Sequence, residues 1–423
     1  MIKNNNNIEI DALNNIRLLL IGPYPPPFGG IATHIRLLAP HLKTNGIGNL
    51  VVITFGDENS DDFFEGVKVY RRNLKKNIFK VFFPQNIKLL LEVFFSLGLK
   101  GLSTTQTAQE AIKAVIINEI FQKEEINFIS SYLSNSSITL IPLKKYWKKF
   151  VPTILTVFGE IYEAPEFFLK HLNIVQELIN LCDHVMSSSQ YCANSLKKIG
   201  IKRDIESIFY GVELSLYESL DSKTYLRNKN AIDHDEVVVF FMGRMLSDMG
   251  LDVYLNCIPK LIQRNNNCRF VIAGATGNLT EDAYIIQKKY PDKVDVFENI
   301  SFFNQGEVYK LADILVAPTF NQRACMGVSI KEAMAASLAV VAGAGGGISE
   351  AVVDGETGYL VPVDVKGKVN EDIFLQKLEI LILNHELRHK FGAAGYIRAK
   401  ELFSVDKTNT RITKLILDVS KAS

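Results

Sequence analysis

The strongest constraint on the fold is an alternation of short apolar runs with longer segments of helical periodicity. From residue 17 onward, runs rich in β-branched residues recur between segments whose apolar residues follow a helical spacing. This alternation is typical of parallel strands joined by crossover helices. In the first half we expect one doubly wound sheet, with strands at 17–22, 50–55, 127–132, 153–157 and 184–189.

The same pattern starts again after a polar interruption at 217–236, YESLDSKTYLRNKNAIDHDE. In the second half we expect strands at 237–243, 269–274, 293–297, 313–318, 339–343 and 358–362. A chain of 423 residues is also too long for one ordinary core. We therefore predict an α/β protein with two Rossmann-like domains, 1–210 and 211–404, and a C-terminal helix at 405–423 that packs back on the first domain.

The expected position of a ligand follows from this architecture. Open α/β sheets bind ligands outside the carboxyl ends of their strands. Two facing parallel sheets therefore predict an active site in a cleft between the domains. No internal repeat indicates a solenoid or a propeller.

Composition and charge exclude several other classes of protein. A formal charge of +1, with 22% charged and 47% hydrophobic residues, gives no global reason to expect a nucleic-acid partner. The five cysteines form no C-x-x-C pair, which argues against a zinc site or a disulfide framework. The N-terminus is polar and Asn-rich where a secretory signal would be apolar, and it predicts a disordered lead-in. We expect a cytoplasmic protein.

Two segments of the first half leave a membrane contact open. No stretch reaches the roughly 18 to 20 apolar residues of a membrane span. Segment 78–98 combines many Phe and Leu with Lys80 and Lys88, and the spacing after Pro84 predicts a helix of about three to four turns with one apolar face. That helix is either buried in the core or lies on a membrane surface. The basic and aromatic run 143–150, LKKYWKKF, is either a solvated helix face or a membrane contact.

The first strand leads into a glycine-containing loop that suits an anion. In GPYPPPFGGIATH, Gly29 and Gly30 directly precede a helix, where backbone amides are free to approach a phosphate. A plain tight turn explains the two glycines equally well. His34, one turn into this helix, is either a structural or a catalytic histidine.

The second half repeats this arrangement at MGRMLSDMG, residues 242–250. Gly243 turns the chain at a strand end, and Arg244 supplies a planar, permanently charged group that suits a diphosphate. A surface salt bridge is the alternative role for Arg244.

Two further helix starts carry candidate ligand-binding groups. Met326, Gly327 and Val328 open a helix whose Glu332 can accept two hydroxyl protons from a ribose, although it could also be an ordinary solvated glutamate. Gly346, Gly347 and Ile348 follow a strand and leave a row of amides free for a phosphate. We expect no metal, because no Asp-x-Asp pair stands at a strand end.

Taken together and in this order, these stretches resemble the retaining glycosyltransferases of family 4, which have the GT-B fold. The shared landmarks are PPFGGIATH, the Ser-Ser-x-Tyr run near Ser188 and Tyr191, YGVEL, GRMLSDMG, VSIKEAMA and GGISEAVVDGETGYLV. The resemblance implies that the second domain binds a nucleotide-sugar donor and the first an acceptor. It also implies that Gly30 approaches the phosphates, Arg244 neutralises them, Glu332 binds the ribose, and the amides of 346–348 complete the phosphate site.

The sequence departs from the family pattern at three positions. Met249 stands where the family usually has a Lys, Ala324 replaces the first glutamate of a pair, and Phe158 stands in place of a His. Arg323 and Lys331 are candidates for replacing the lost positive charge, and Glu160 for replacing a polar contact to the sugar.

These features predict a hexosyl- or pentosyltransferase that moves a sugar from a nucleotide sugar to a glycan, a lipid-linked acceptor or a small molecule, with retention of configuration. Glu332, Arg244 and Glu160 are its candidate catalytic residues. The resemblance favours a UDP-sugar as donor, and no separate cofactor is expected. One alternative is a catalytically weakened GT-B protein that binds a nucleotide or a partner. Another is an epimerase or phosphorylase with the same fold.

Overall fold

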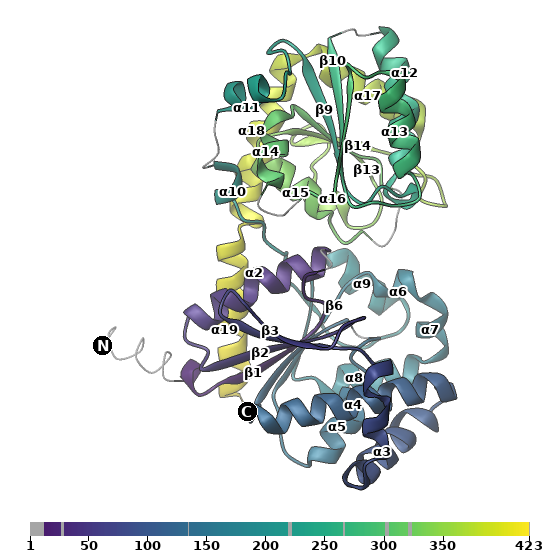
Figure 1. Ribbon diagram of the computed structural model, residues 1–423, viewed down its shortest axis with the longest axis vertical. Helices are drawn as coiled ribbons and strands as arrows, with labels where there is room; N and C mark the ends of the chain where they lie inside the picture. The colour runs from purple at the N-terminus through teal and green to yellow at the C-terminus, as the bar shows by residue number, and fades with distance from the viewer. Residues whose placement is uncertain are drawn as a thin grey trace, which may run out of the picture. The chain divides into compact units, whose positions relative to one another are not determined.

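The computed structural model describes residues 12–26, 29–133, 135–218, 222–264, 267–300, 304–319 and 324–422, apart from the side chain of residue 163. Of the expected disordered lead-in, residues 1–15, the first eleven lie outside this part, whereas 12–14 are helical, so the expectation of disorder is wrong for them. The chain divides into two compact units. Unit 1 comprises Met1–Ile208 and Thr408–Ser423, and unit 2 comprises Phe209–Lys407. Each unit contains one α/β sheet (Figure 1).

Unit 1 is built on an eight-stranded sheet with the order β3-β4-β2-β1-β5-β6-β7-β8. Its strands are β1 (Arg17–Ile21), β2 (Asn49–Phe55), β3 (Ser60–Phe64), β4 (Val67–Arg72), β5 (Phe128–Tyr132), β6 (Thr153–Val157), β7 (His184–Ser187) and β8 (Glu206–Ser207). Neighbouring strands are parallel, except that β3 runs antiparallel to β4. The five strands expected in this half are present, whereas β3, β4 and the two-residue β8 were not expected.

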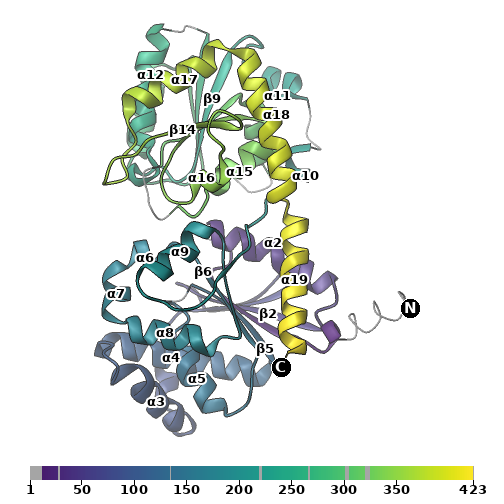
Figure 2. The ribbon, with the colours of Figure 1, turned by 180° about the vertical axis from the view of Figure 1, so that it is seen from behind.

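Helices cover both faces of this sheet. They are α2 (Gly30–Thr44), α3 (Ile87–Val93), α4 (Thr104–Lys123), α5 (Leu140–Trp147), α6 (Glu160–Glu163), α7 (Pro165–Lys170), α8 (Leu172–Leu181), α9 (Gln190–Lys198) and α19 (Val405–Lys421). Alternate residues of the central strands, such as Leu19 and Val51, share one buried core with α4, α5 and α8. On the other face α19 runs beside α2 (Figure 2), where the Asn409 side-chain amide donates to the Leu37 carbonyl at 3.1 Å.

Unit 2 contains a six-stranded parallel sheet with the order β11-β10-β9-β12-β13-β14. The strands are β9 (Val237–Met242), β10 (Cys268–Gly274), β11 (Val294–Glu298), β12 (Ile314–Ala317), β13 (Ala339–Gly343) and β14 (Gly358–Val361). The helices are α10 (Ser215–Glu218), α11 (Lys223–Lys229), α12 (Leu251–Arg264), α13 (Thr280–Lys289), α14 (Gln305–Leu311), α15 (Val328–Ala335), α16 (Ile348–Ala351), α17 (Glu371–Leu383) and α18 (His385–Leu402). One core joins the sheet to α12 and α17, and a second joins its other face to α14 and α15. All six strands expected here are present.

The Phe-rich segment of unit 1 differs from its expected form. It consists of two short 3₁₀ helices (Lys75–Phe82 and Pro84–Asn86), then α3, then one π-helical turn (Phe94–Gly98). Leu89, Val93 and Leu97 are fully buried in the core, but Ile87, Leu91, Phe95 and others are about half exposed or more. The prediction of a single apolar face is therefore wrong, because apolar side chains occupy both faces. Within the described residues, no helix is long and apolar enough to cross a membrane.

Candidate functional site

The strand order of each sheet identifies the place where a ligand crevice forms. In unit 2, β10 lies on one side of β9 and β12 on the other, so the chain reverses its direction across the sheet at β9. The loops that leave the carboxyl ends of β9 and β12 therefore diverge, and such switch points bind ligands in open α/β sheets. In unit 1 the corresponding reversal lies between β1 and β5.

The loop after β9 presents Arg244 at this switch point of unit 2. The amide of Gly243 donates to the Ala273 carbonyl at 3.0 Å, and that of Met245 to the Ala275 carbonyl at 2.8 Å. These bonds fix the residues on either side of Arg244 to the end of β10. The Arg244 side chain is exposed, and no hydrogen-bond acceptor for its guanidinium occurs among the residues that the structure describes. The backbone at Arg244 is therefore held at the end of a strand, while its exposed guanidinium has no hydrogen-bond partner among the described residues.

The loops after β9 and β12 are held together at close range. Gly250 has a φ of +76°, and a Cβ added there would lie 2.1 Å from the Pro318 carbonyl oxygen. The Thr319 hydroxyl also donates to the Met249 carbonyl at 3.4 Å. The Met249 side chain, at the position where the family usually has a Lys, packs against the core of unit 2. Close backbone approach at Gly250 thus gives the switch point its shape.

The glycine loops before α15 and α16 are joined to each other. The Gly347 amide donates to the Ala324 carbonyl at 2.8 Å. Gly327 caps α15 with a φ of +73°, and Gly346 has a φ of +59°. Met326 and Ile348 are buried beneath these loops, while Val328 begins α15. First-turn amides of α15 have no partner within their own helix, so the Gly327 end offers free donors. The Gly347 amide is used by Ala324, and the Ile348 amide donates to the Gly345 carbonyl at 3.2 Å, so the expected row of free amides at 346–348 is not present. Arg323 lies outside the described residues.

Glu332 occupies the second turn of α15 and is held by two neutral donors. Its side chain is 7% exposed, and its carboxylate accepts from the Tyr309 hydroxyl at 2.7 Å and from the Gln305 amide at 3.1 Å. Burial raises the pKa of Glu332 above its usual range, and these hydrogen bonds oppose that shift. Tyr217 packs edge-on against Tyr309, with the ring centroids 5.5 Å apart. An ordinary solvated glutamate is thereby excluded.

Sequence reasoning missed the residues that orient this carboxylate. Gln305 and Tyr309 are four residues apart on α14, so both side chains project from one face of that helix. This spacing is the only signal that the sequence contains, and it is common on helix surfaces. Their role depends on the packing of α14 beside α15, which local sequence does not encode.

The neighbouring Lys331 is buried and turned toward a different part of unit 2. Its ammonium donates to the Tyr210 carbonyl at 2.7 Å and lies 5.8 Å from the Phe403 ring centroid. Burial is the main cause that lowers the pKa of Lys331 to about 8. Its interaction with Tyr210 gives Lys331 a structural position, and its compensation for a lost phosphate contact stays a prediction.

The lowered pKa of Lys331 predicts a specific dependence of stability on pH. An ammonium with an ordinary pKa of 10.5 when unfolded and about 8 when folded costs stability at neutral pH, and deprotonation relieves that cost as pH rises from 8 to 10.5. Relative to a Lys331→Met variant, the unfolding free energy of the natural chain should therefore increase by up to about 3 kcal/mol across this window. Urea denaturation of both proteins at pH 7 and pH 10 measures this difference. An unchanged difference would show that Lys331 does not titrate as its burial implies.

In unit 1 the candidate residues gather at the carboxyl ends of β1, β5 and β6. Phe158 stacks on Tyr132, with ring centroids 6.5 Å apart, and His34 lies against the same tyrosine at 5.9 Å. Glu160 begins α6, is buried, and accepts a hydrogen bond from the Phe158 amide. Phe158 thus belongs to an aromatic group where the family pattern has a His.

The same edge of unit 1 includes the start of α2. Gly29 caps this helix and Gly30 begins it, and both are exposed. Nothing lies within 4 Å of a Cβ added at Gly29, so the space beside this glycine is open to a ligand.

The structure places the candidates of each unit on loops and helix starts that follow the carboxyl ends of its strands, and that they form one binding site stays a prediction. The unit 2 group contains Gly243, Arg244, Gly327, Glu332 and residues 346–348, and the unit 1 group contains Gly29, Gly30, His34 and Glu160. That the two groups share one ligand stays a prediction. Among the described residues, no cluster of three or more His, Cys, Asp or Glu side chains could hold a metal ion.

Comparison with known proteins associates unit 2 with sugar transfer. Residues 222–398 match the family model described as "Glycosyl transferases group 1". The D-inositol 3-phosphate glycosyltransferase of Corynebacterium glutamicum is 30% identical over 164 residues, which are 36% of this chain and 38% of that protein. The chain thus spans about two fifths of the length of this curated relative.

Comparison with solved structures extends over both units. Sucrose-phosphate synthase from Thermosynechococcus elongatus superposes with a TM-score of 0.74 at 16% identity, covering 97% of this chain and all of that one. Anabaena HepE, solved in complex with UDP and glucose, has a TM-score of 0.69 at 15% identity and covers 95% of this chain and 99% of its own. At this identity the likeness shows the fold, which is two Rossmann-like domains in the GT-B arrangement of elements.

Proposed function

We propose that this chain, a GT-B protein similar to the family 4 glycosyltransferases, transfers a sugar from a nucleotide-sugar donor to an acceptor with retention of the anomeric configuration. The group 1 glycosyltransferase match over 222–398 supports the transfer of sugar. The choice of UDP as the nucleotide is supported by its presence in the HepE structure. Whether the acceptor is a glycan, a lipid-linked sugar or a small molecule stays a prediction.

One observation carries this proposal: the loops and helix starts at the carboxyl ends of the unit 2 strands carry an exposed cation, the first-turn amides of α15 and an oriented carboxylate. Arg244 and the first-turn amides of α15, which follow Gly327, suit the two phosphates of a nucleoside diphosphate. Glu332 suits the two hydroxyls of a ribose, because it is a carboxylate whose position is fixed by Tyr309 and Gln305. These are the recognition groups that the non-reacting part of a nucleotide sugar requires.

In the proposed reaction the diphosphate is both the leaving group and the base that accepts a proton. An acceptor hydroxyl attacks the anomeric carbon from the face that the diphosphate leaves, and a diphosphate oxygen takes the proton of that hydroxyl. The bond from the anomeric carbon to the diphosphate oxygen breaks, and its electron pair stays with the nucleoside diphosphate. Arg244 and the loop amides would stabilise the charge that accumulates on this oxygen. No enzymic base is needed for this step.

The residues around the transferred sugar are expected to set the donor preference. Ala324 has no carboxylate to bind sugar hydroxyls, and Phe158 has no polar atom on its side chain. Phe158 is also nearly buried against Tyr132. We therefore propose a donor sugar that makes fewer polar contacts at these two positions than the usual hexoses do.

A ligand screen tests the nucleotide site directly. We expect UDP and a UDP-sugar to raise the melting temperature of the natural chain, since a ligand of the native state stabilises it by mass action. Arg244→Gln should weaken UDP binding about tenfold, because it removes one charged contact to a phosphate. Titration calorimetry measures both proteins, with Arg264→Gln as the control, because Arg264 lies at the far end of α12.

Three outcomes of this screen are informative. Equal UDP affinity of the natural chain and Arg244→Gln would contradict the assigned phosphate site. Absence of any nucleotide binding would contradict the proposed function. Tight nucleotide binding without transfer from any donor, in the presence of the true acceptor, would favour a binding protein over an enzyme.

A further inference from the structure

The Phe-rich segment of unit 1 exposes an unusual amount of apolar surface, which we call the Phe/Lys face. Its nine large apolar side chains, each 40% to 78% exposed, are Ile78, Phe79, Phe82, Phe83, Ile87, Leu91, Phe94, Phe95 and Leu99. They lie along a single stretch of chain, where the ring centroids of Phe79 and Phe83 are 5.9 Å apart and those of Phe94 and Phe95 are 5.7 Å apart. Contiguous apolar patches of this kind mark interaction surfaces in soluble proteins.

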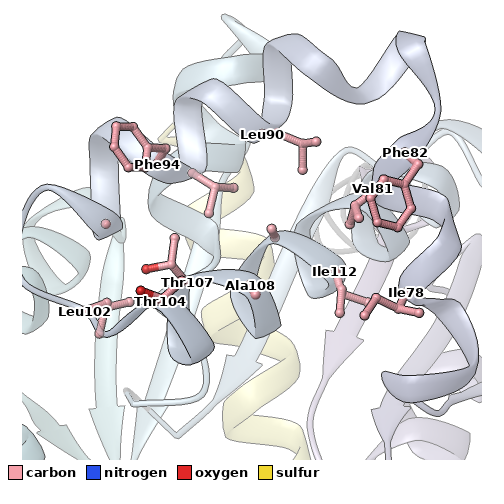
Figure 3. A pocket seen from close by; sticks show the side chains of 13 residues that line it. Ile78, Val81, Phe82, Leu90, Phe94, Leu102, Thr104, Thr107, Ala108 and Ile112 are labelled. Atoms are coloured by element: carbon pink, nitrogen blue, oxygen red, sulfur yellow. The ribbon is translucent and has the colours of Figure 1, made fainter.

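An apolar cavity opens in the same face. It has a volume of about 500 Å³ and lies between the 75–98 helical segments and α4 (Figure 3). Phe82, Leu90 and Phe94 point into it from one side, and Ala108 and Ile112 of α4 line the other. The only side-chain polar atoms in its lining belong to Thr104 and Thr107. Such a cavity suits an alkyl chain and offers no charged group to a polar ligand.

The charge of this segment differs from that of the whole chain. Residues 75–102 contain five lysines and one glutamate, a net charge of +4, whereas the whole chain has a formal charge of +1. Lys80 and Lys100 form ion pairs with Glu119 and Glu177. Lys75, Lys76 and Lys88 are exposed and have no ion-pair partner among the described residues.

The exposed apolar side chains, the cavity and the positive charge together indicate which kind of partner binds the Phe/Lys face. With Lys80 and Lys100 neutralised by their ion pairs, Lys75, Lys76 and Lys88 against Glu92 leave a net charge of +2 on the face. A second copy docking by the same patch would bring two such positive surfaces together, which opposes a symmetric dimer. A layer of anionic lipid headgroups has the complementary charge and attracts lysines near its surface. Phenylalanine and leucine side chains gain free energy when they enter the boundary between headgroups and acyl chains.

We propose that the Phe/Lys face is a membrane-docking site for an anionic bilayer, with one lipid alkyl chain entering the cavity beside α4. Lys75, Lys76 and Lys88 would contact headgroup phosphates, and Phe82, Phe94 and Phe95 would lie among the first methylenes of the chains. This site is separate from the nucleotide site of unit 2, and it operates whether or not the chain transfers sugar.

Co-sedimentation with vesicles tests the proposal with the full-length chain and no nucleotide. We expect binding to vesicles of phosphatidylcholine mixed with phosphatidylglycerol to be roughly tenfold or more tighter than to phosphatidylcholine alone. Salt should weaken this binding, since it screens exposed charges. Equal affinity for both vesicles, or no binding to either, would overturn the proposal.

Three variants test separately the lysine charges, the insertion of the phenylalanines into the bilayer and the entry of an alkyl chain into the cavity. The triple variant Lys75→Gln, Lys76→Gln, Lys88→Gln should lose the preference for anionic vesicles. The double variant Phe82→Ser, Phe95→Ser should lose roughly tenfold or more in affinity, while the control Leu383→Ser removes an equally exposed apolar residue from unit 2 without effect. Ala108→Phe fills the cavity from its exposed rim and should weaken binding while the melting temperature stays unchanged.

The variants also reveal other occupants. Full binding by both the triple and the double variant would overturn the site. Full binding by Ala108→Phe would overturn the insertion of an alkyl chain into the cavity. A concentration-dependent dimer that Phe82→Ser, Phe95→Ser dissociates, without vesicle binding by the natural chain, would identify a second copy as the occupant and also overturn the proposal.

Discussion

Glu332→Gln is expected to lower kcat/KM for the nucleotide sugar about 100-fold. The substitution preserves the size of the side chain but removes the charge that we propose accepts hydrogen bonds from the ribose. Two hydrogen bonds to a charged group weaken together, a loss of about 3 kcal/mol. The amide also presents donor hydrogens to Tyr309 and Gln305, which donate to the carboxylate in the natural chain. Both the bound ribose and the orientation of residue 332 should therefore be affected.

Initial rates with a UDP-sugar, together with calorimetric binding of UDP, measure this effect. Glu386→Gln is the matched control, because Glu386 is an exposed helix glutamate on α18. The pH profile adds an independent readout. Burial raises the pKa of Glu332, so the activity of the natural chain should fall with decreasing pH while still above the ordinary value of 4.5, and Glu332→Gln should lack this fall. A variant with natural activity and an unchanged profile would remove Glu332 from the site.

Gly250→Ala is expected to destabilise unit 2 by about 3 kcal/mol or more. Two costs add at this position. A φ of +76° lies in the left-handed region, where a Cβ costs roughly 1–2 kcal/mol. The new Cβ would also lie 2.1 Å from the Pro318 carbonyl oxygen, so the loop after β12 must shift. Because this loop leads to α15, the variant should bind nucleotide more weakly as well.

Gly355→Ala separates the two costs. Gly355 has almost the same φ, +75°, but nothing lies within 4 Å of a Cβ added there. It should therefore lose only the backbone contribution, roughly 1–2 kcal/mol. Urea denaturation followed by far-UV circular dichroism compares the two variants. Equal destabilisation by both would mean that the close approach to Pro318 does not lower the unfolding free energy of Gly250→Ala. The loop after β12 could then move away from residue 250 more easily than its geometry indicates.

Most strands could be predicted from the sequence because they are buried on both faces. Runs such as TILTV and AVVAG contain few or no polar residues, so each is visible without knowledge of its neighbours. The strands β3 and β4 were missed for the opposite reason. β3 is the edge strand and β4 lies next to it, and they carry Asp61, Asp62, Arg71 and Arg72, whose charges pair across the two strands. Cross-strand pairing makes these charges compatible with a sheet, and the sequence of one strand does not reveal it.

The glycine loops of the site could be predicted because glycine has a local conformational role. Gly327 and Gly346 both adopt positive φ at helix starts that the pattern of strands and helices had located. The partners of Glu332 could not be predicted, since Gln305 and Tyr309 reach it through the packing of separate helices. The exposed apolar side chains of α3 were not predicted, because helical periodicity does not show which faces of a helix are covered by other elements.

The order in which the chain builds its two units decides how the protein can be divided. Unit 2 is one uninterrupted stretch, Phe209–Lys407, whereas unit 1 takes its last piece from Thr408–Ser423. A gene fragment that ends after residue 208 would therefore yield a first half with an uncovered surface beside α2. A fragment coding for 209–407 retains the candidate residues of unit 2, Gly243, Arg244, Gly327, Glu332 and 346–348, but not Gly29 and Gly30 of unit 1. Expressed alone, the second half is thus the natural material for ligand-binding work, while the first half needs its final helix supplied by fusion or as a separate peptide.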